Sequence, residues 1–239
     1  MITNQQIKTI GRERKLTHFV SAKEFALALL EGNIQKSMAI IQELDYQGYN
    51  TAFIYDELIT PAMKYIGELW QKNEISVAEE HLATGICEVI LSHYMLNIQK
   101  ADTQEKKVLL FCLEGEHHTI GLKMCASTFQ ENGWEVKNLG PNLPLEHAVY
   151  MARKWQPDVI GMSLSMSFSI PTLRPYIEEL ERLAPRPAII VGSRLIQDYD
   201  LRQYCSPSTI FISEQSELKS WLQIYNNANS LIHSVRSDS

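Results

Sequence analysis

Apolar residues recur every three or four positions through the first hundred residues, which is the spacing of one face of an α-helix. The pattern predicts about four helices between residues 19 and 99. Ser21 can cap the first helix and Gly32 can end it, while Pro61 predicts a kink or a break within the third. Short connections and one-sided apolar stripes favour an antiparallel helical bundle over 19–99.

The second half follows a different pattern, in which short apolar runs alternate with helical spacing. The runs predict five strands, at 108–113, 135–139, 158–165, 188–192 and 209–213. Helical patterns follow them at 120–132, 144–155, 171–184, 195–204 and 215–226. This alternation predicts an α/β domain over 108–228, with a Rossmann-like, flavodoxin-like parallel sheet of five strands behind the all-α N-terminal domain.

Three segments outside these two domains have no regular apolar pattern. We interpret 1–18 as an N-terminal segment, the polar stretch 100–107 as a linker and 229–239 as a loose tail. The N-terminus has no apolar signal-peptide core, and no apolar run approaches the ~18 residues of a membrane span. We therefore expect a cytoplasmic protein without membrane contact.

Composition narrows the classes of function. The net charge is −6 and no long basic run is present, which argues against binding to a nucleic-acid backbone. The four cysteines are scattered without a CxxC pair, which argues against a zinc ribbon and a disulfide framework. Scattered free cysteines fit a reducing compartment.

The stretch "LEGEHHTIGLKM", residues 113–124, carries the most informative chemistry. It follows the first predicted strand, and ligands of parallel sheets bind beyond the carboxyl ends of strands. An exposed imidazole at His118 can bind a metal through one nitrogen, while Glu116 can fix the other nitrogen. Gly121 permits a bulky group to approach the next helix. An ordinary surface or capping histidine is the simpler alternative.

The spacing Glu116-x-His118-x-x-Gly121 resembles the D/E-x-H-x-x-G signature of cobalamin-binding domains. Ser163 and Leu164 in "GMSLS" resemble the S-x-L element of that family. Gly192 in "IIVGS" resembles its glycine element, although Ser193 stands where a second glycine is usual.

The resemblance implies that His118 is the lower axial ligand of cobalt and that the nucleotide tail of the cofactor runs along the sheet. His117 lacks the motif spacing and is the less favoured ligand. The resemblance also implies cofactor contacts from residues beside the three elements: His117, Thr119, Ile120, Ser165 and Val191.

The bundle contains a second informative stretch, "LWQKNEISVAEEHLA" at 69–83. Without the resemblance, the simplest interpretation is that Trp70 packs in the bundle core and that Glu80 and His81 cap a helix. The spacing W-x9-E-H is similar to that of the adenosylcobalamin photoreceptors of the CarH/LitR type. It implies that Trp70 covers the upper ligand of cobalt, flanked by Glu80 and His81, with Val77 one turn before His81.

Two departures from that family affect the expected function. The photoreceptors carry an N-terminal MerR-type DNA-binding domain, and the 18 residues ahead of the bundle are too few for one. Direct DNA binding is therefore not expected. The histidine that follows the tryptophan in the photoreceptors is replaced by Gln71, and an amide is a poor cobalt ligand.

These observations favour a sensor, rather than an enzyme, that binds adenosylcobalamin and responds to light. Its output would pass through a partner protein or a change of oligomer. The main alternative is a corrinoid carrier of a methyltransferase system, with methylcobalamin as the bound form. A mutase small subunit and an adaptor without cofactor are further alternatives.

Overall fold

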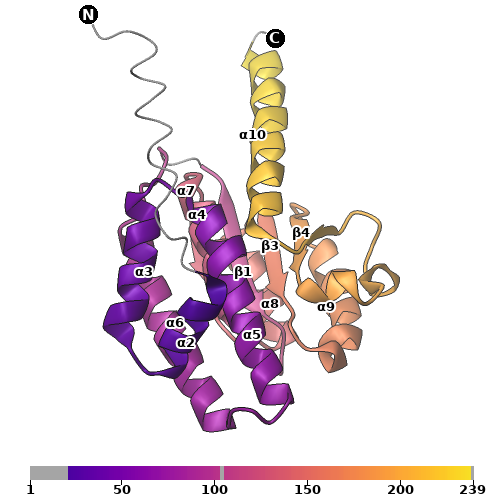
Figure 1. Cartoon of the computed structure of the whole chain (residues 1–239). Coiled ribbons are helices and arrows are strands. Elements are labelled where there is room, and N and C mark those ends of the chain that lie inside the picture. The colour runs from indigo at the N-terminus through magenta and orange to yellow at the C-terminus, as the bar shows by residue number, and fades with distance from the viewer. Residues whose placement is uncertain (1–20, 103–104, 238–239) are drawn as a thin grey trace, which may run out of the picture.

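The computed structural model describes residues 21–102 and 105–237, with side chains through residue 227. The predicted segment 1–18 and two positions of the predicted linker, 103–104, lie outside the described residues. Figure 1 shows a helical bundle beside an α/β domain with a central sheet. The fold class expected from the sequence is therefore confirmed.

The bundle begins with α2 (Ala22–Leu30) and α3 (Ile34–Tyr46) and ends with α6 (Val77–Leu96). Between them α4 (Thr51–Phe53), the π-helix η1 (Ile54–Ile59) and α5 (Thr60–Gln71) follow one another directly. Ser21 caps α2 and accepts a hydrogen bond from the backbone N–H of Glu24. Gly32, with φ of +71°, follows the end of α2. Both predicted end signals are confirmed.

The predicted kink or break at Pro61 takes a different form. Pro61 lies in the first turn of α5, and the chain stays helical through it. Proline has no N–H to donate to the carbonyl four residues earlier. The turn immediately before α5 is π-helical, so a widened turn stands where the sequence predicts an interruption.

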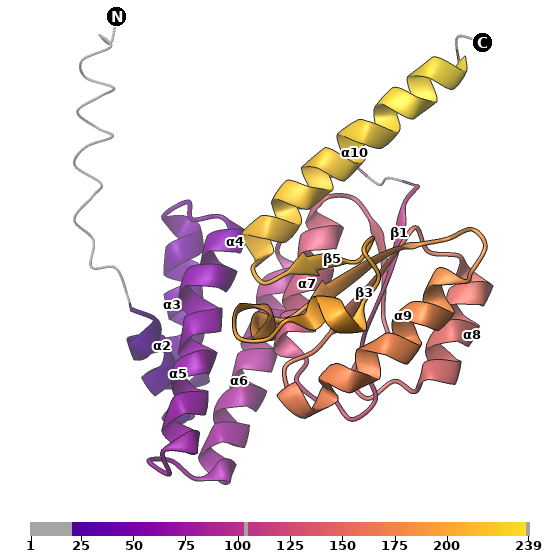
Figure 2. The same ribbon diagram turned by 90° about the vertical axis from the view of Figure 1, so that its right-hand side faces the viewer.

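The α/β domain contains five parallel strands in the order β2-β1-β3-β4-β5. They are β1 (Lys107–Cys112), β2 (Glu135–Asn138), β3 (Val159–Ser163), β4 (Ala188–Gly192) and β5 (Ile210–Ile212). The helices are α7 (Ile120–Glu131), α8 (Leu145–Trp155), α9 (Leu173–Glu181) and α10 (Gln215–Ser237). In Figure 2, α8 and α9 lie on the side of the sheet away from the bundle.

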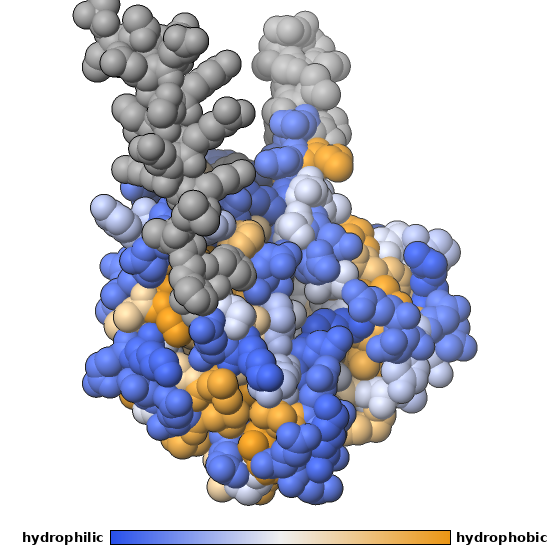
Figure 3. Space-filling view, viewed as in Figure 1, coloured by the Kyte–Doolittle hydropathy of each residue, from blue (hydrophilic) through white to orange (hydrophobic). Residues whose placement is uncertain are grey.

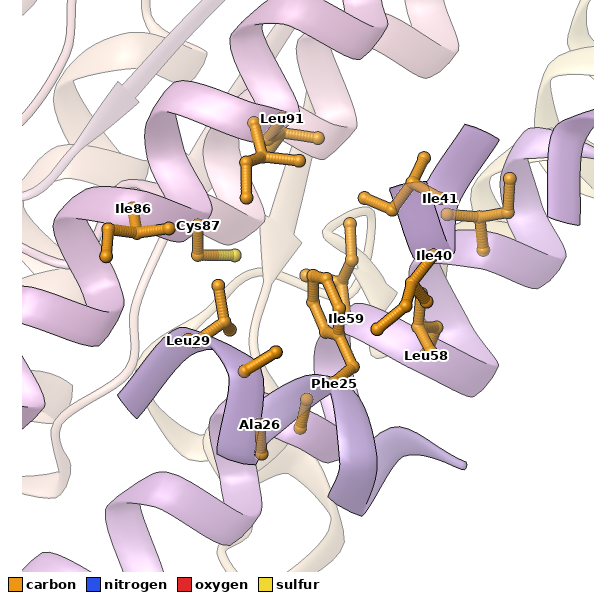
Figure 4. Close-up of a cluster of buried hydrophobic side chains, with 14 of the residues drawn as sticks. Phe25, Ala26, Leu29, Ile40, Ile41, Leu58, Ile59, Ile86, Cys87 and Leu91 are labelled. Atoms are coloured by element: carbon orange, nitrogen blue, oxygen red, sulfur yellow. The ribbon is translucent and has the colours of Figure 1, made fainter. Parts of the chain in front are cut away.

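Helix α7 belongs to two cores. One face, with Leu122 and Phe129, packs against the sheet and α10. Another face adds Met124 to the buried core of the bundle, and Ile120 packs against the same core. The bundle core itself is formed by aliphatic and aromatic side chains (Figure 4). The bundle and the sheet are therefore joined through a shared apolar helix.

Three predicted segments differ from the structure. The helix predicted at 195–204 is two 3-10 helices, η3 (Arg194–Gln197) and η4 (Leu201–Tyr204), started by the side chains of Ser193 and Asp200. The helix predicted at 171–184 starts as the 3-10 helix η2 (Ser167–Thr172), which contains Pro171, and continues as α9.

The third difference is the predicted loose tail, because α10 continues to Ser237. Residues 229–237 contain no glycine or proline, so no residue there strongly opposes a helix. In the described part of the chain, no helix has both the length and the apolar character needed to cross a bilayer.

A buried hydrogen bond also joins the bundle to α7. The hydroxyl of Tyr55 in η1 lies 2.9 Å from the hydroxyl of Ser127, and both side chains are buried. Tyr55→Phe should lower the free energy of unfolding by about 1 kcal/mol, because Ser127 loses its partner without gaining water. Tyr46→Phe, at an 86% exposed tyrosine, is the control. Urea unfolding measures both, and equal losses would contradict the prediction.

Candidate functional site

The turn after β1 holds Glu116 and His118 at the carboxyl edge of the sheet. Gly115 begins it with φ of +81°, a conformation that favours glycine, and its N–H donates to the side chain of Asn142 at 2.8 Å. The strand order changes direction between β1 and β3, and open α/β sheets bind ligands at such a point.

Glu116 is a fully buried carboxylate with four hydrogen-bond donors around it. One oxygen accepts from the ring Nδ1 of His118 at 2.5 Å and from its backbone N–H at 3.0 Å. The other accepts from the backbone N–H groups of Ser165 at 2.7 Å and Met166 at 3.2 Å. Burial alone would raise the pKa of Glu116, but these donors lower it to about 2. The carboxylate thus stays charged and joins the β1 turn to the loop after β3.

His118 is held on its inner side and open on its outer side. Its side chain is 57% exposed, while Glu116 is completely buried. The bond to Glu116 raises the pKa of His118, against the opposing effect of burial. With Nδ1 engaged, Nε2 is the nitrogen that faces outward, and it has no hydrogen-bond partner within the described residues. This carboxylate–imidazole arrangement is the one that orients metal-binding histidines.

The ends of β3 and β4 form the neighbouring rim of the site. Ser163 is paired in register with Gly192, and both are partly exposed. A Cβ added at Gly192 would meet only a backbone oxygen at 3.8 Å, so space remains above it. Ser193 is buried, and its hydroxyl accepts from the N–H of Leu195. This geometry gives the serine a capping role in the place where a second glycine was expected.

Two predicted contact residues are buried beneath this rim. Leu164 and Val191 belong to the core that packs against α8 and α9. Their side chains support the rim from below, and the structure does not bring them to the surface.

The start of α7 completes the lower part of the site. His117 is exposed, and Ile120 packs against the bundle core. Thr119 donates its hydroxyl to Glu88 of α6. A Cβ added at Gly121 would find no atom within 4 Å, so the surface there is open to a large ligand.

The bundle contributes exposed residues at the end of α5 and the start of α6. Trp70 and Val77 are 45% and 54% exposed. Glu80 lies 2.6 Å from the ring Nδ1 of His81 and accepts from the hydroxyl of Thr84 at 2.8 Å. The charge of Glu80 also raises the pKa of His118, so the first turn of α6 lies within electrostatic reach of the histidine turn. Figure 3 shows apolar side chains gathered over the lower part of the bundle.

Sequence reasoning missed several residues that shape the site. Glu88 and Lys123 form an ion pair at 3.4 Å between α6 and α7. Tyr176 donates to the carbonyl of Leu143 at 2.6 Å and accepts from the N–H of Glu114. The sequence offered one indication of Glu88: it follows Glu80 by eight residues and therefore lies on the same face of the predicted helix. No feature of the sequence indicated that Tyr176 contributes to the site.

The donor set fits a cobalt ion that brings most of its own ligands. Among the described residues, no group of three or more His, Cys, Asp or Glu side chains could hold a bare ion. A single outward imidazole on a fixed turn suits a metal already held in the plane of a large ring, which needs one axial ligand from the protein. The open surface at Gly121 and Gly192 offers room for such a ring and its tail.

Comparison with protein families agrees with this geometry. Residues 106–203 match a B12 binding domain, and residues 21–94 match a second family model, also described as a B12 binding domain. The first match spans β1 to β4 and ends in η4, and the second spans most of the bundle. Helix α10 lies beyond both.

Curated relatives include a transcriptional repressor and a corrinoid protein. The chain is 26% identical over 133 residues to the HTH-type transcriptional repressor CarH of Myxococcus xanthus, covering 55% of this chain and 44% of that one. It is 26% identical over 151 residues to dimethylamine corrinoid protein 2 of Methanosarcina acetivorans, covering 59% of this chain and 67% of that one. The chain thus spans less than half of CarH.

The fold is shared with a solved structure. The monomethylamine corrinoid protein of Methanosarcina barkeri superposes with a TM-score of 0.71 at 17% identity, over 84% of this chain and 97% of that one. With both of its domains matched and a histidine turn suited to cobalt, the chain belongs to the family of B12-binding domain proteins.

Proposed function

We propose that the protein is a light-responsive sensor that binds adenosylcobalamin between its two domains. The observation that carries this proposal is the group of open side chains at the start of α6. Trp70 and Val77 offer exposed apolar surface, and Glu80, whose charge acts on His118, offers polar contacts together with His81. An indole suits the flat adenine of an adenosyl group, and Glu80 can accept from its ribose or adenine donors.

The chain's own residues would act in three ways. Glu116 keeps the proton on Nδ1 of His118, which leaves the Nε2 lone pair for cobalt. Trp70 covers the upper ligand and excludes water from it. When bound, adenosylcobalamin supplies a cobalt–carbon bond that visible light can break. Contacts of Trp70 and Glu80 exist only while the adenosyl group is present, and this difference supplies the free energy for moving the bundle.

The replacement of the photoreceptor histidine by Gln71 removes one candidate ligand for cobalt after the adenosyl group has left. It stands beside Trp70 and is exposed, and its amide is a poor ligand for cobalt. His81 offers an alternative, because its Nδ1 is engaged by Glu80 and its other nitrogen is open. The pair repeats the arrangement of Glu116 and His118 on the opposite domain.

A corrinoid carrier of a methyltransferase system is the second candidate. It is favoured by the match to the dimethylamine corrinoid protein, of which this chain covers 67%. Illumination separates the two functions. A sensor loaded with adenosylcobalamin should change its absorption spectrum together with its mass or its binding to a partner protein. A carrier should accept and donate a methyl group with a partner enzyme.

His118→Ala should lose most of its cobalamin during gel filtration, because the proposed ligand of cobalt is removed. Any remaining cofactor should show a spectrum without histidine coordination. His93→Ala is the control, at an exposed histidine in the last turn of α6 that is not part of the predicted site. An unchanged spectrum in the His118 variant would refute the ligand assignment.

Trp70→Ala should weaken adenosylcobalamin far more than hydroxocobalamin, because only the former has an upper group for the indole to cover. The loss of apolar contact corresponds to roughly tenfold or more in affinity for the adenosyl form. Lys72→Ala, two residues away and also exposed, should bind both forms as the wild type does. Titration followed by absorbance measures the affinities. Similar losses for both cobalamins would argue against a covering role.

A further inference from the structure

Glu88 connects the bundle to the turn that carries His118. It lies two helical turns after Glu80 on α6, and its side chain is 32% exposed. It accepts a hydrogen bond from the hydroxyl of Thr119 and pairs with Lys123 at 3.4 Å. Thr119 directly follows His118, so the contact reaches the backbone next to the imidazole.

The hydroxyl of Thr119 is diverted to make this contact. Thr119 occupies the N-cap position of α7, where a threonine usually accepts from the first N–H groups of the helix. No side-chain cap bond is formed within α7, and the hydroxyl points to Glu88 instead. The contact therefore replaces a local bond with one between the two domains.

We propose that Glu88 is a positioning residue for His118. This inference rests on the proposed role of His118 as the ligand of cobalt. Glu116 determines which ring nitrogen faces outward, and Glu88 holds the turn at a defined place relative to α6. Since the bundle would cover the upper face of the cofactor, Glu88 links the positions of the upper and lower sides.

The test compares Glu88→Ala and Thr119→Val with Thr119→Ser, which keeps the hydroxyl. In the cofactor-free protein, the amides of His118 and Lys123, which donate to Glu116 and to the carbonyl of Thr119, should exchange with deuterium roughly tenfold faster in the first two variants. With hydroxocobalamin, both should show a smaller fraction of histidine-bound cobalt by absorbance and release the cofactor roughly tenfold faster. Thr119→Ser should restore the wild-type values.

A wild-type spectrum and release rate in Thr119→Val would overturn the proposal, even if that variant unfolds more easily, because the contact would then be structural only. A failure of His118 as the ligand is recognised separately. In that case His118→Ala itself keeps the wild-type spectrum, and the positioning role falls with it.

A different observation concerns the start of α10, outside both matched B12 domains. The backbone N–H groups of Gln215 and Ser216 donate to the two oxygens of Asp56, at 2.8 and 2.9 Å. Asp56 belongs to η1 of the bundle. The first N–H groups of a helix have no partner within it, and a carboxylate there also interacts favourably with the helix dipole. The bundle therefore supplies the cap of α10.

The surroundings of Asp56 join three elements. Its neighbour Tyr55 bonds to Ser127 of α7, and Thr128 donates to the side chain of Gln215 at 3.0 Å. The cap is held by a π-helix, a rare form that is frequent at functional sites. From this junction α10 extends away from the body of the molecule (Figures 1 and 2).

We propose that α10 transmits the output of the protein, because its first turn responds to a movement of the bundle. Asp56 can cap α10 only while η1 stays against α7, so a shift of the bundle withdraws the cap and loosens the first turn of α10. The assumption that the cofactor causes this shift of the bundle rests on the proposed function. The cap itself does not, and it can be tested without cofactor.

The test compares Asp56→Ala with Glu57→Ala, an adjacent exposed carboxylate whose side chain forms no hydrogen bond or ion pair with the described residues. Without cofactor, amides 215–219 should exchange roughly tenfold faster in Asp56→Ala, and at the wild-type rate in Glu57→Ala. Asp56→Asn should recover part of the protection. In the wild type, exchange at these amides should differ severalfold between the adenosylcobalamin and hydroxocobalamin forms.

That difference should vanish in Asp56→Ala, while its spectra with both cobalamins remain those of the wild type. Equal exchange in the two alanine variants would overturn the cap. Equal exchange in the two cobalamin forms of the wild type would overturn the output role. Neither result depends on the response to light, so a failure of the light sensor would be seen separately in the spectra.

Discussion

The buried carboxylate of Glu116 is the constraint on which the site depends. A charge with no exposure to water is tolerated only when it is well hydrogen-bonded, and Glu116 has four donors. Two of them come from His118 and two from the loop after β3. Satisfying one carboxylate thus sets the tautomer of the imidazole, directs Nε2 outward and holds two loops together at the switch point of the sheet.

The second constraint is the attachment of the bundle to the α/β domain. Helix α7 contributes to both cores, so its position is determined from two sides. Polar contacts then connect the bundle at separate places: Glu88 near His118, Tyr55 at the buried centre and Asp56 at α10. Tyr55 and Asp56 are adjacent in η1, so the contacts to α7 and α10 start from the same turn of the bundle.

Under the proposed function, a sensor and a corrinoid carrier would share the turn that holds His118. They would differ at the end of α5 and the start of α6, where Trp70 and His81 are exposed and Glu80 is partly buried. The conflict between Gln71 and the photoreceptor pattern lies there as well. The carboxylate partner of His81 shows that the chain contains a second oriented imidazole that the local motif does not reveal.

The periods of the apolar residues determined the two-domain order, the five strands and most helices, because periodicity reflects which face of each element is buried. The spacing of Glu116 and His118 likewise specified their bond, since both lie on one short turn. The split of 195–204 into two 3-10 helices and the extension of α10 escaped the pattern. Only the tertiary structure could decide that Glu88 meets Thr119 and that Asp56 caps a helix 159 residues later. These contacts join residues that packing brings together, and a local sequence pattern does not predict which distant residues will meet.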